Sequence, residues 1–122
     1  MTVSHILAVL SSSDLVIDVE VIEMNVEPKM QSLRAKARLK KGYVLYVNEG
    51  LGENYRRYSY HLQKDDKMIR RWDNAPHWRG VRTFPFHLHI PDKDTPIECD
   101  EVFVNDVLLE IRDIFGLTSE DS

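Results

Sequence analysis

The sequence is poor in residue types that mark several common classes of protein. Its single cysteine, Cys99, excludes an intrachain disulfide, a four-cysteine zinc site and a CxxC redox motif. No stretch approaches the roughly 18 consecutive apolar residues that a membrane-spanning helix needs. Residues 1–10 also lack the basic start and the small-residue cleavage site of a secretory leader. We therefore expect a cytoplasmic protein without a membrane segment.

What is present suits a globular fold. At roughly 100 to 200 residues per domain, the 122 residues correspond to a single domain over residues 1–122. Hydrophobic residues make up 43% of the chain and charged residues 30%, which is enough apolar material for a core. No internal repeat or low-complexity segment is visible, so tandem modules are not expected.

Charge is distributed unevenly along the chain. Residues 29–82 hold 14 of the 16 basic residues and only 5 of the 20 acidic ones, although the formal net charge of the whole chain is -4. Such a segment favours a basic surface for a polyanion, most plausibly the phosphates of nucleic acid. The acidic flanks could equally fold against the basic segment and partly neutralise it. Both interpretations stay open from the sequence.

Apolar residues that alternate with polar ones predict a series of strands. A half-buried strand is expected at residues 15–21, and residues 33–39 and 43–47 are expected to form a hairpin. Residues 55–62 and 68–73 flank a polar turn and predict a second hairpin. The prolines that follow leave room for a short strand at most.

The register of the second hairpin depends on the length of its turn. A two-residue turn at Asp65 and Asp66 would place Tyr60 opposite Arg71. The same turn would place Tyr58 opposite Asp73. A change of one residue in the loop would scramble this pairing.

Helical spacing is expected at both ends of the chain. Residues 4–10 predict a short helix capped by Ser4. Apolar residues recur at helical spacing from residue 104 to residue 115, where Asp100 can cap the helix and Gly116 can end it. The expected fold class is α+β, an antiparallel β-meander of about five strands with the C-terminal amphipathic helix packed on one face. The other face is expected to stay partly open.

The histidines point to a site for proton transfer. His87 and His89 are two residues apart, so in an extended segment both rings project from one face. Histidine titrates near pH 7 and can move a proton both ways. With His77 as a third partner and Asp73 orienting one ring, these residues are candidates for catalysis. RNA cleavage needs such a base and acid, together with a cation for the developing charge.

Cations and aromatic rings near the histidines suggest contacts to nucleic acid. The candidate phosphate-binding residues are Arg70, Arg71, Arg79 and Arg82. Tyr58 and Tyr60 could stack on single-stranded bases, or they could pack the sheet against the helix.

The same segment also offers ligands for a metal and a nearby cysteine. His87, His89 and Asp73, together with His77 or His61, would supply three or four nitrogen and oxygen ligands for a metal. Because paired histidines occur in many strands without a metal, we expect neither a metal nor another cofactor. Cys99 lies among acidic residues, which disfavour a thiolate, so we do not expect a cysteine nucleophile.

The same residues resemble a known family. The segments Tyr60-His61-Leu62-Gln63, Arg71-Trp72-Asp73-Asn74-Ala75-Pro76-His77 and Thr83-Phe84-Pro85, followed by His87 and His89, are similar to the TumE-like proteins of bacteria and archaea. The resemblance implies the toxin of a type II toxin-antitoxin system, encoded beside a helix-turn-helix antitoxin, with ribonuclease activity suspected. The family often has a histidine where this chain has Trp78 and another where it has Phe86.

These observations lead to a first hypothesis and two alternatives. The first is a toxin that cleaves RNA without a metal, with His87 or His89 as base and acid, and Arg71 and Arg82 as phosphate clamps. The second is a non-catalytic module that binds nucleic acid or an acidic antitoxin segment through basic strands such as residues 34–38. The third is a histidine metal site with hydrolytic activity. An open, charged sheet also makes a homodimer plausible.

Overall fold

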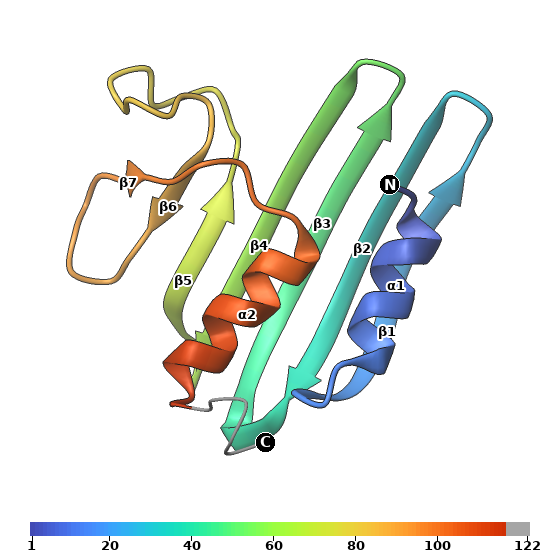
Figure 1. Cartoon of the computed structure of the whole chain (residues 1–122), viewed down its shortest axis with the longest axis horizontal. Helices are drawn as coiled ribbons and strands as arrows, with labels where there is room; N and C mark the ends of the chain where they lie inside the picture. The colour runs from blue at the N-terminus through green and yellow to red at the C-terminus, as the bar shows by residue number, and fades with distance from the viewer. Residues whose placement is uncertain (117–122) are drawn as a thin grey trace.

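The computed structural model describes residues 1–116, which form one antiparallel sheet of seven strands and two helices (Figure 1). The elements are α1 (Val3–Ser12), β1 (Val16–Val26), β2 (Met30–Leu39), the 3₁₀ turn η1 (Lys40–Gly42), β3 (Tyr43–Gly52), β4 (Tyr55–Lys64), β5 (Lys67–Asp73), β6 (His87–His89), β7 (Ile97–Glu98) and α2 (Val104–Ile114). The strands lie in the sheet in chain order, so each pairs with the next. The predicted α+β meander is confirmed, with seven strands in place of about five.

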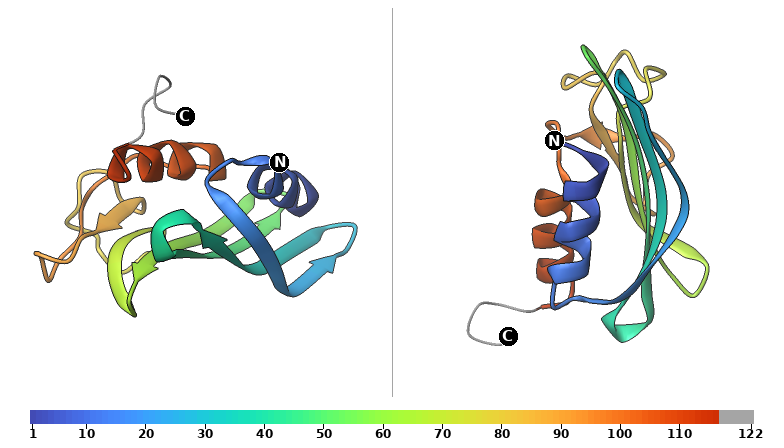
Figure 2. Two further views of the ribbon diagram at one scale, coloured as in Figure 1. Left: turned by 90° about the horizontal axis from the view of Figure 1, so that it is seen from below. Right: turned by 90° about the vertical axis from the view of Figure 1, so that its right-hand side faces the viewer.

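Both helices cover the same face of the sheet (Figure 2). We call this the helix face, and the opposite side the open face. Alternate residues of β2 to β5 point to the helix face because side chains alternate along a strand, and these residues are buried with the apolar sides of α1 and α2. The largest fully buried side chains are Trp72, Tyr60, Ile6, Leu10, Leu15, Leu33, Leu39, Leu45, Leu62 and Ile111.

The hairpin between β4 and β5 has the predicted turn but not the predicted register. Asp65 and Asp66 adopt φ values of 52° and 62°, as the two central residues of a tight hairpin turn do. A bulge beside Leu62 then adds one residue, Ile69, to β5. The pairing shifts by one position, so Trp72 rather than Arg71 lies opposite Tyr60.

This bulge decides which residues of β5 face the helices. Trp72 points to the helix face, where it is fully buried, and its indole Nε1 donates to Glu110 Oε2 of α2 at 2.8 Å. Arg71 and Asp73 therefore point to the open face, opposite His61 and Ser59. The predicted pairs, Tyr60 with Arg71 and Tyr58 with Asp73, are wrong because the sequence shows no sign of the extra residue.

The strand β1 at the edge of the sheet is longer and more exposed than its pattern predicts. Ile17 and Val21 lie in the apolar alternation that begins at Leu15, which predicts one buried side for them, but they are 57% and 46% exposed. Two register shifts, near Val16 and after Val21, interrupt the regular alternation of β1. As an edge strand, β1 has a neighbour on one side alone, so less of it is covered.

The two helices form where they were predicted, with different caps. Thr2 rather than Ser4 caps α1, and its Oγ1 accepts a hydrogen bond from His5 N. At the start of α2 the capping carboxylate is that of Asp106 rather than Asp100, and it accepts a hydrogen bond from Phe103 N at 2.8 Å. Gly116, with φ of 72°, follows the end of α2 as expected. Within residues 1–116, neither helix is long and apolar enough to cross a membrane.

The acidic N-terminal flank does fold against the basic segment. Glu20 of β1 lies opposite Lys36 of β2 in the register. Asp18 lies opposite Arg38, whose Nε donates to its Oδ1 at 3.0 Å. At this edge of the open face, charge neutralisation therefore competes with any binding of a polyanion.

Candidate active site on the open sheet face

The predicted residues Asp73, His87 and His89 come together on the open face. Asp73 ends β5 and pairs with His87 of β6, and two residues earlier in β5, on the same face, Arg71 pairs with His89. His87 Nε2 lies 2.7 Å from Asp73 Oδ1, and His89 Nε2 lies 3.7 Å from Asp73 Oδ2. One buried carboxylate thus faces both imidazoles.

His87 is held firmly and is closed to solvent. Its side chain is 1% exposed, and its Nδ1 lies 2.8 Å from the carbonyl oxygen of Pro85. Because a carbonyl only accepts, Nδ1 carries a proton and donates it there. Nε2 contacts Asp73 closely, but the carboxylate lies too far out of line for a hydrogen bond. Such an enclosed ring can orient its neighbours but cannot touch an RNA substrate.

His89 is the more accessible of the pair. Its side chain is 22% exposed, and its ring meets the rings of His87 and Trp78 edge to face, with centroids 4.9 and 6.1 Å away. Partial burial lowers the pKa of His89 below its usual value of 6.5, although the charge of Asp73 opposes this shift. A neutral imidazole with an accessible nitrogen is what a general base requires.

A cation and another histidine lie beside this pair. Arg71 Nε lies 3.1 Å from Asp73 Oδ2, and the Arg71 side chain is 47% exposed. The register sets His61 of β4 on the other side of Arg71 from His89. Burial, followed by the charge of Arg71, lowers the pKa of His61 below 6.5. A phosphate drawn to Arg71 would lie between two histidines.

The same cluster has the composition of a metal site. One ligating atom each from Asp73, His87 and His89 lies within 4.8 Å of the others. Three such ligands with a fourth position open are the usual set of a catalytic zinc ion. The contact of His87 Nδ1 with a backbone carbonyl is also typical of histidines that bind metals.

The other predicted residues lie outside the cluster. His77 is exposed in the loop between β5 and β6, and no contact places it with the cluster within residues 1–116. In the same loop, Arg79 lies over the ring of Phe84. Arg82 is engaged by Glu98, with Nη2 2.9 Å from Oε2.

Arg70 points away from the cluster. It pairs with Leu62, which is fully buried on the helix face. Its Nη1 donates to the carbonyl oxygen of Ile69 at 2.7 Å. Of the four predicted arginines, Arg71 alone contacts the cluster in the described part of the chain.

Tyr58 and Tyr60 require a correction. They are 2% and 0% exposed on the helix face, so neither ring offers a surface on which a base could stack. The alternative, packing of the sheet against the helix, is what the structure shows. Burial raises the pKa of both hydroxyl groups, which keeps them protonated: the Tyr60 hydroxyl donates to Glu49, and the Tyr58 hydroxyl accepts from Val102 N at 3.4 Å.

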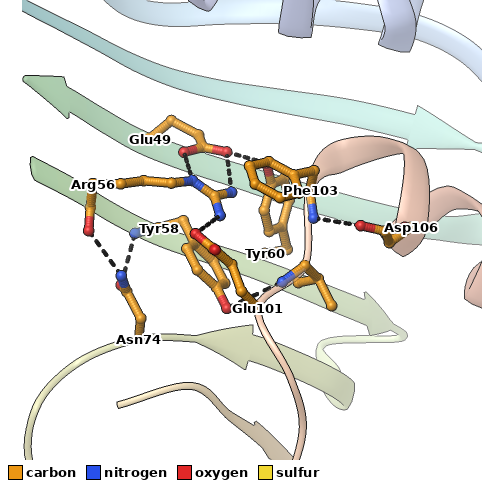
Figure 3. A network of polar contacts seen from close by, with 9 residues as sticks. Glu49, Arg56, Tyr58, Tyr60, Asn74, Glu101, Phe103 and Asp106 are labelled. Atoms are coloured by element: carbon orange, nitrogen blue, oxygen red, sulfur yellow. Dashed lines mark hydrogen bonds and ion pairs between the residues drawn. The ribbon is translucent and has the colours of Figure 1, made fainter. Parts of the chain in front are cut away.

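These tyrosines belong to a buried polar network around Arg56 (Figure 3). Glu49 is 3% exposed. Its Oε2 accepts from Arg56 Nη2 at 2.9 Å and also from the Tyr60 hydroxyl. Arg56 Nη1 reaches Glu101 Oε2 at 3.0 Å. The guanidinium carbon of Arg56 also lies 4.0 Å from the centroid of the Tyr58 ring. The network ties β3 and β4 to the segment before α2.

Asn74 extends this network to the end of β5. Its Oδ1 accepts from Tyr58 N at 2.9 Å, and its Nδ2 donates to the carbonyl oxygen of Arg56 at 2.8 Å. The Asp73 carboxylate accepts from Ala75 N at 3.0 Å. The segment Asp73-Asn74-Ala75 thus fixes the exit from β5, which holds the Asp73 carboxylate against the histidines.

The thiol of Cys99 is not suited to attack on a substrate. Burial, followed by nearby carboxylates, raises the pKa of Cys99 to about 11. The thiolate is therefore scarce near neutral pH, in agreement with the interpretation of the sequence.

Sequence reasoning gave His61 no catalytic role and overlooked Tyr46. The structure sets both in one cross-strand row that runs from Lys36 through Tyr46, His61 and Arg71 to His89. Alternation in β4 could have shown that His61 faces away from Tyr60. Its place beside Arg71 depends on the bulge at Ile69 and had no visible signal.

Comparison with known proteins supports the family indicated by the motifs. The model of a family described as Toxin TumE matches residues 6–115. Comparisons with curated proteins and with solved structures gave no significant match. The family match spans both helices and all seven strands except the first part of α1.

Proposed function

Since the chain belongs to the TumE toxin family, we propose that this toxin acts by cleaving RNA at the Asp73–His87–His89 cluster. One observation carries the proposal: a partly exposed histidine of lowered pKa stands beside a buried carboxylate and an accessible arginine on an open sheet face. Membership of the family also implies an antitoxin partner. That this partner is a helix-turn-helix protein, within a type II system, is part of the proposal.

In the proposed reaction His89 is the base and no metal takes part. The ring nitrogen of neutral His89 that does not face Asp73 removes the proton of a ribose 2′-hydroxyl, and the oxygen attacks the adjacent phosphorus. The bond from phosphorus to the 5′ oxygen breaks, which leaves a 2′,3′-cyclic phosphate and a 5′-hydroxyl end. Arg71 binds the phosphate and offsets the charge that develops on it. Asp73 and buried His87 are positioning residues that hold the ring of His89.

The leaving 5′ oxygen needs a proton, and His61 is placed to donate it. His61 and His89 flank Arg71 on neighbouring strands, roughly 10 Å apart at two strand spacings. A phosphate held at Arg71 would lie between the two rings. His61 in its charged form then acts as the acid, and His89 in its neutral form acts as the base.

Purified protein incubated with labelled single-stranded RNA tests the proposal. We expect cleavage that resists EDTA and falls about 100-fold or more in His89→Ala, because a general base contributes roughly 10²- to 10⁴-fold. His5→Ala, at an exposed position of α1, is the matched control and should cleave normally. Cleavage by His89→Ala at the normal rate would show that the assignment is wrong.

The EDTA arm separates the proposal from the metal alternative. The three ligating atoms within 4.8 Å of one another make a metal a specific competitor. Loss of cleavage in EDTA, with recovery on added zinc or manganese, would replace the metal-independent mechanism. Intact RNA that is bound by wild type and His89→Ala alike would favour the non-catalytic binding module instead.

The rate of RNA cleavage is expected to reach its maximum at a pH below 6.5. The pKa values of His61 and His89 are both lowered from 6.5. His61 must be charged and His89 neutral, so the product of these two fractions is largest between the two lowered pKa values. We expect the rate to fall both below this optimum and toward pH 7.5. A rate that rises with pH and then stays level would show that His61 is not the acid.

A further inference from the structure

The open face is hollowed at Gly50, beside the cluster. Gly50 of β3 lies between Ser32 of β2 and Arg57 of β4 in the register, and it has no side chain to fill this position. The resulting depression has a volume of about 270 Å³. Arg34, Asn48, Tyr55 and Arg57 are among its lining residues. Neither helix covers this side of the sheet (Figure 2).

Two arginines and an exposed tyrosine line the depression, and its two carboxylates, Glu23 and Glu49, each lie against an arginine. Arg57 is exposed and makes no ion pair with any residue of the described chain. Arg34 is held loosely, with its Nη1 3.9 Å from Glu23 Oε2. Tyr55 is 52% exposed, and its ring lies 3.7 Å from where a Cβ on Gly50 would be. A planar base fits against such a ring, and guanidinium groups suit the flanking phosphates.

The depression adjoins the cluster that we propose to be catalytic. Ser59, two residues beyond Arg57 in β4, pairs with Asp73. By strand geometry the Cα atoms of Arg57 and Asp73 are roughly 8 Å apart. Among the described open-face side chains of β2 to β6, Asp73 is the one carboxylate, and it is already engaged by Arg71. The path between depression and cluster therefore carries no unpaired negative charge.

We infer that the depression at Gly50 binds a nucleotide of single-stranded RNA that flanks the bond to be cleaved. This inference rests on the proposed function, because it supplies the substrate-binding part of the same site. The base packs against Tyr55 over Gly50, and Arg57 binds a backbone phosphate. Single-stranded RNA fits better than a duplex, because a base must leave its stack to enter the depression.

Gly50→Val and Arg57→Ala test the inference in the full-length protein. Gly50 has no positive φ, and an added Cβ would meet Tyr55 at an ordinary contact distance of 3.7 Å, so the valine fills the depression without straining the strand. The probe is a fluorescent single-stranded RNA with 2′-O-methyl groups, which prevent cleavage during the binding measurement. Lys93→Ala, at an exposed position between β6 and β7, is the matched charge control.

We expect the dissociation constant to rise about tenfold in Gly50→Val, in line with the loss of one stacked base. Arg57→Ala should also weaken binding and should lower the slope of log K against log salt by about 0.7, the value for one phosphate contact on a single strand. Lys93→Ala should bind like wild type. If Gly50→Val does not fold, the affinity and salt dependence of Arg57→Ala alone test the inference.

Binding by both variants at wild-type affinity and salt dependence would overturn the inference. So would tight binding of a polyglutamate peptide but not of RNA, lost in the same variants, because the surface would then suit an acidic protein. Binding and cleavage are measured separately. Absence of cleavage by wild type would contradict the proposed function and leave the binding result intact.

Discussion

Asp73→Asn is expected to lower the rate of RNA cleavage about 100-fold or more while the protein stays folded. The amide keeps the size of the side chain but removes the charge that faces His87, His89 and Arg71. Without that charge the ring of His89 loses its orientation, and a misplaced base forfeits much of the roughly 10²- to 10⁴-fold that it contributes. Single-turnover cleavage rates measure the effect.

The pH profile of this variant distinguishes positioning from a loss of structure. The charge of Asp73 raises the pKa of His89 against the larger effect of burial. Its removal should lower that pKa further, so the acid side of the rate profile should move to lower pH. Asp92→Asn, at an exposed position between β6 and β7, is the matched control and should leave rate and profile unchanged. A normal rate in Asp73→Asn would contradict the assignment.

Arg56→Met is expected to destabilise the fold by about 3–5 kcal/mol, the usual cost of removing one partner of a buried ion pair. The side chains of Arg56 and Glu49 are 12% and 0% exposed, so Glu49 would be left as a buried charge without its cation (Figure 3). The cation–π contacts of Arg56 with the Tyr58 and Phe103 rings, at 4.0 and 4.3 Å, would be lost as well. Urea unfolding monitored by circular dichroism measures the loss.

Two further variants make this result interpretable. Arg38→Met breaks an ion pair with Asp18 in which both side chains are more than half exposed, and it should cost far less. The triple variant Glu49→Leu/Arg56→Met/Tyr60→Phe removes both charges together with the buried hydroxyl that donates to Glu49, and it should recover much of the stability, because apolar side chains of similar size often replace a buried pair well. Equal losses in Arg56→Met and Arg38→Met would contradict the role assigned to the network.

Much of the candidate site follows from local sequence. The alternation around His87 and His89 predicts that both rings share a face, and β6 confirms the strand. The family motif picks out Asp73 and Arg71 beside them. His77 was joined to the same set because it lies in the motif, but a loop residue is placed by the path of the whole segment, and His77 lies exposed outside the cluster.

The tyrosines show where local reasoning fails. Tyr58 and Tyr60 carry the same residue type and spacing whether they face solvent or the core, so alternation alone cannot choose between the two faces. The two helices decide this choice, because whichever face they cover becomes the core. Trp72 of β5 is buried on the helix face, so its neighbours in the strand, Arg71 and Asp73, project from the open face.

The α+β meander, the two helices, the hairpin turn at Asp65 and Asp66 and the family could all be predicted from the amino-acid sequence, because they depend on the period of apolar residues and on short motifs. Which side chains meet across strands, in contrast, depends on how the strands pack into the sheet. One extra residue at Ile69 places Arg71 between His61 and His89 instead of opposite Tyr60. A bulge changes no local pattern, yet it moves every later side chain of the strand to the other face, so only the packed sheet reveals it.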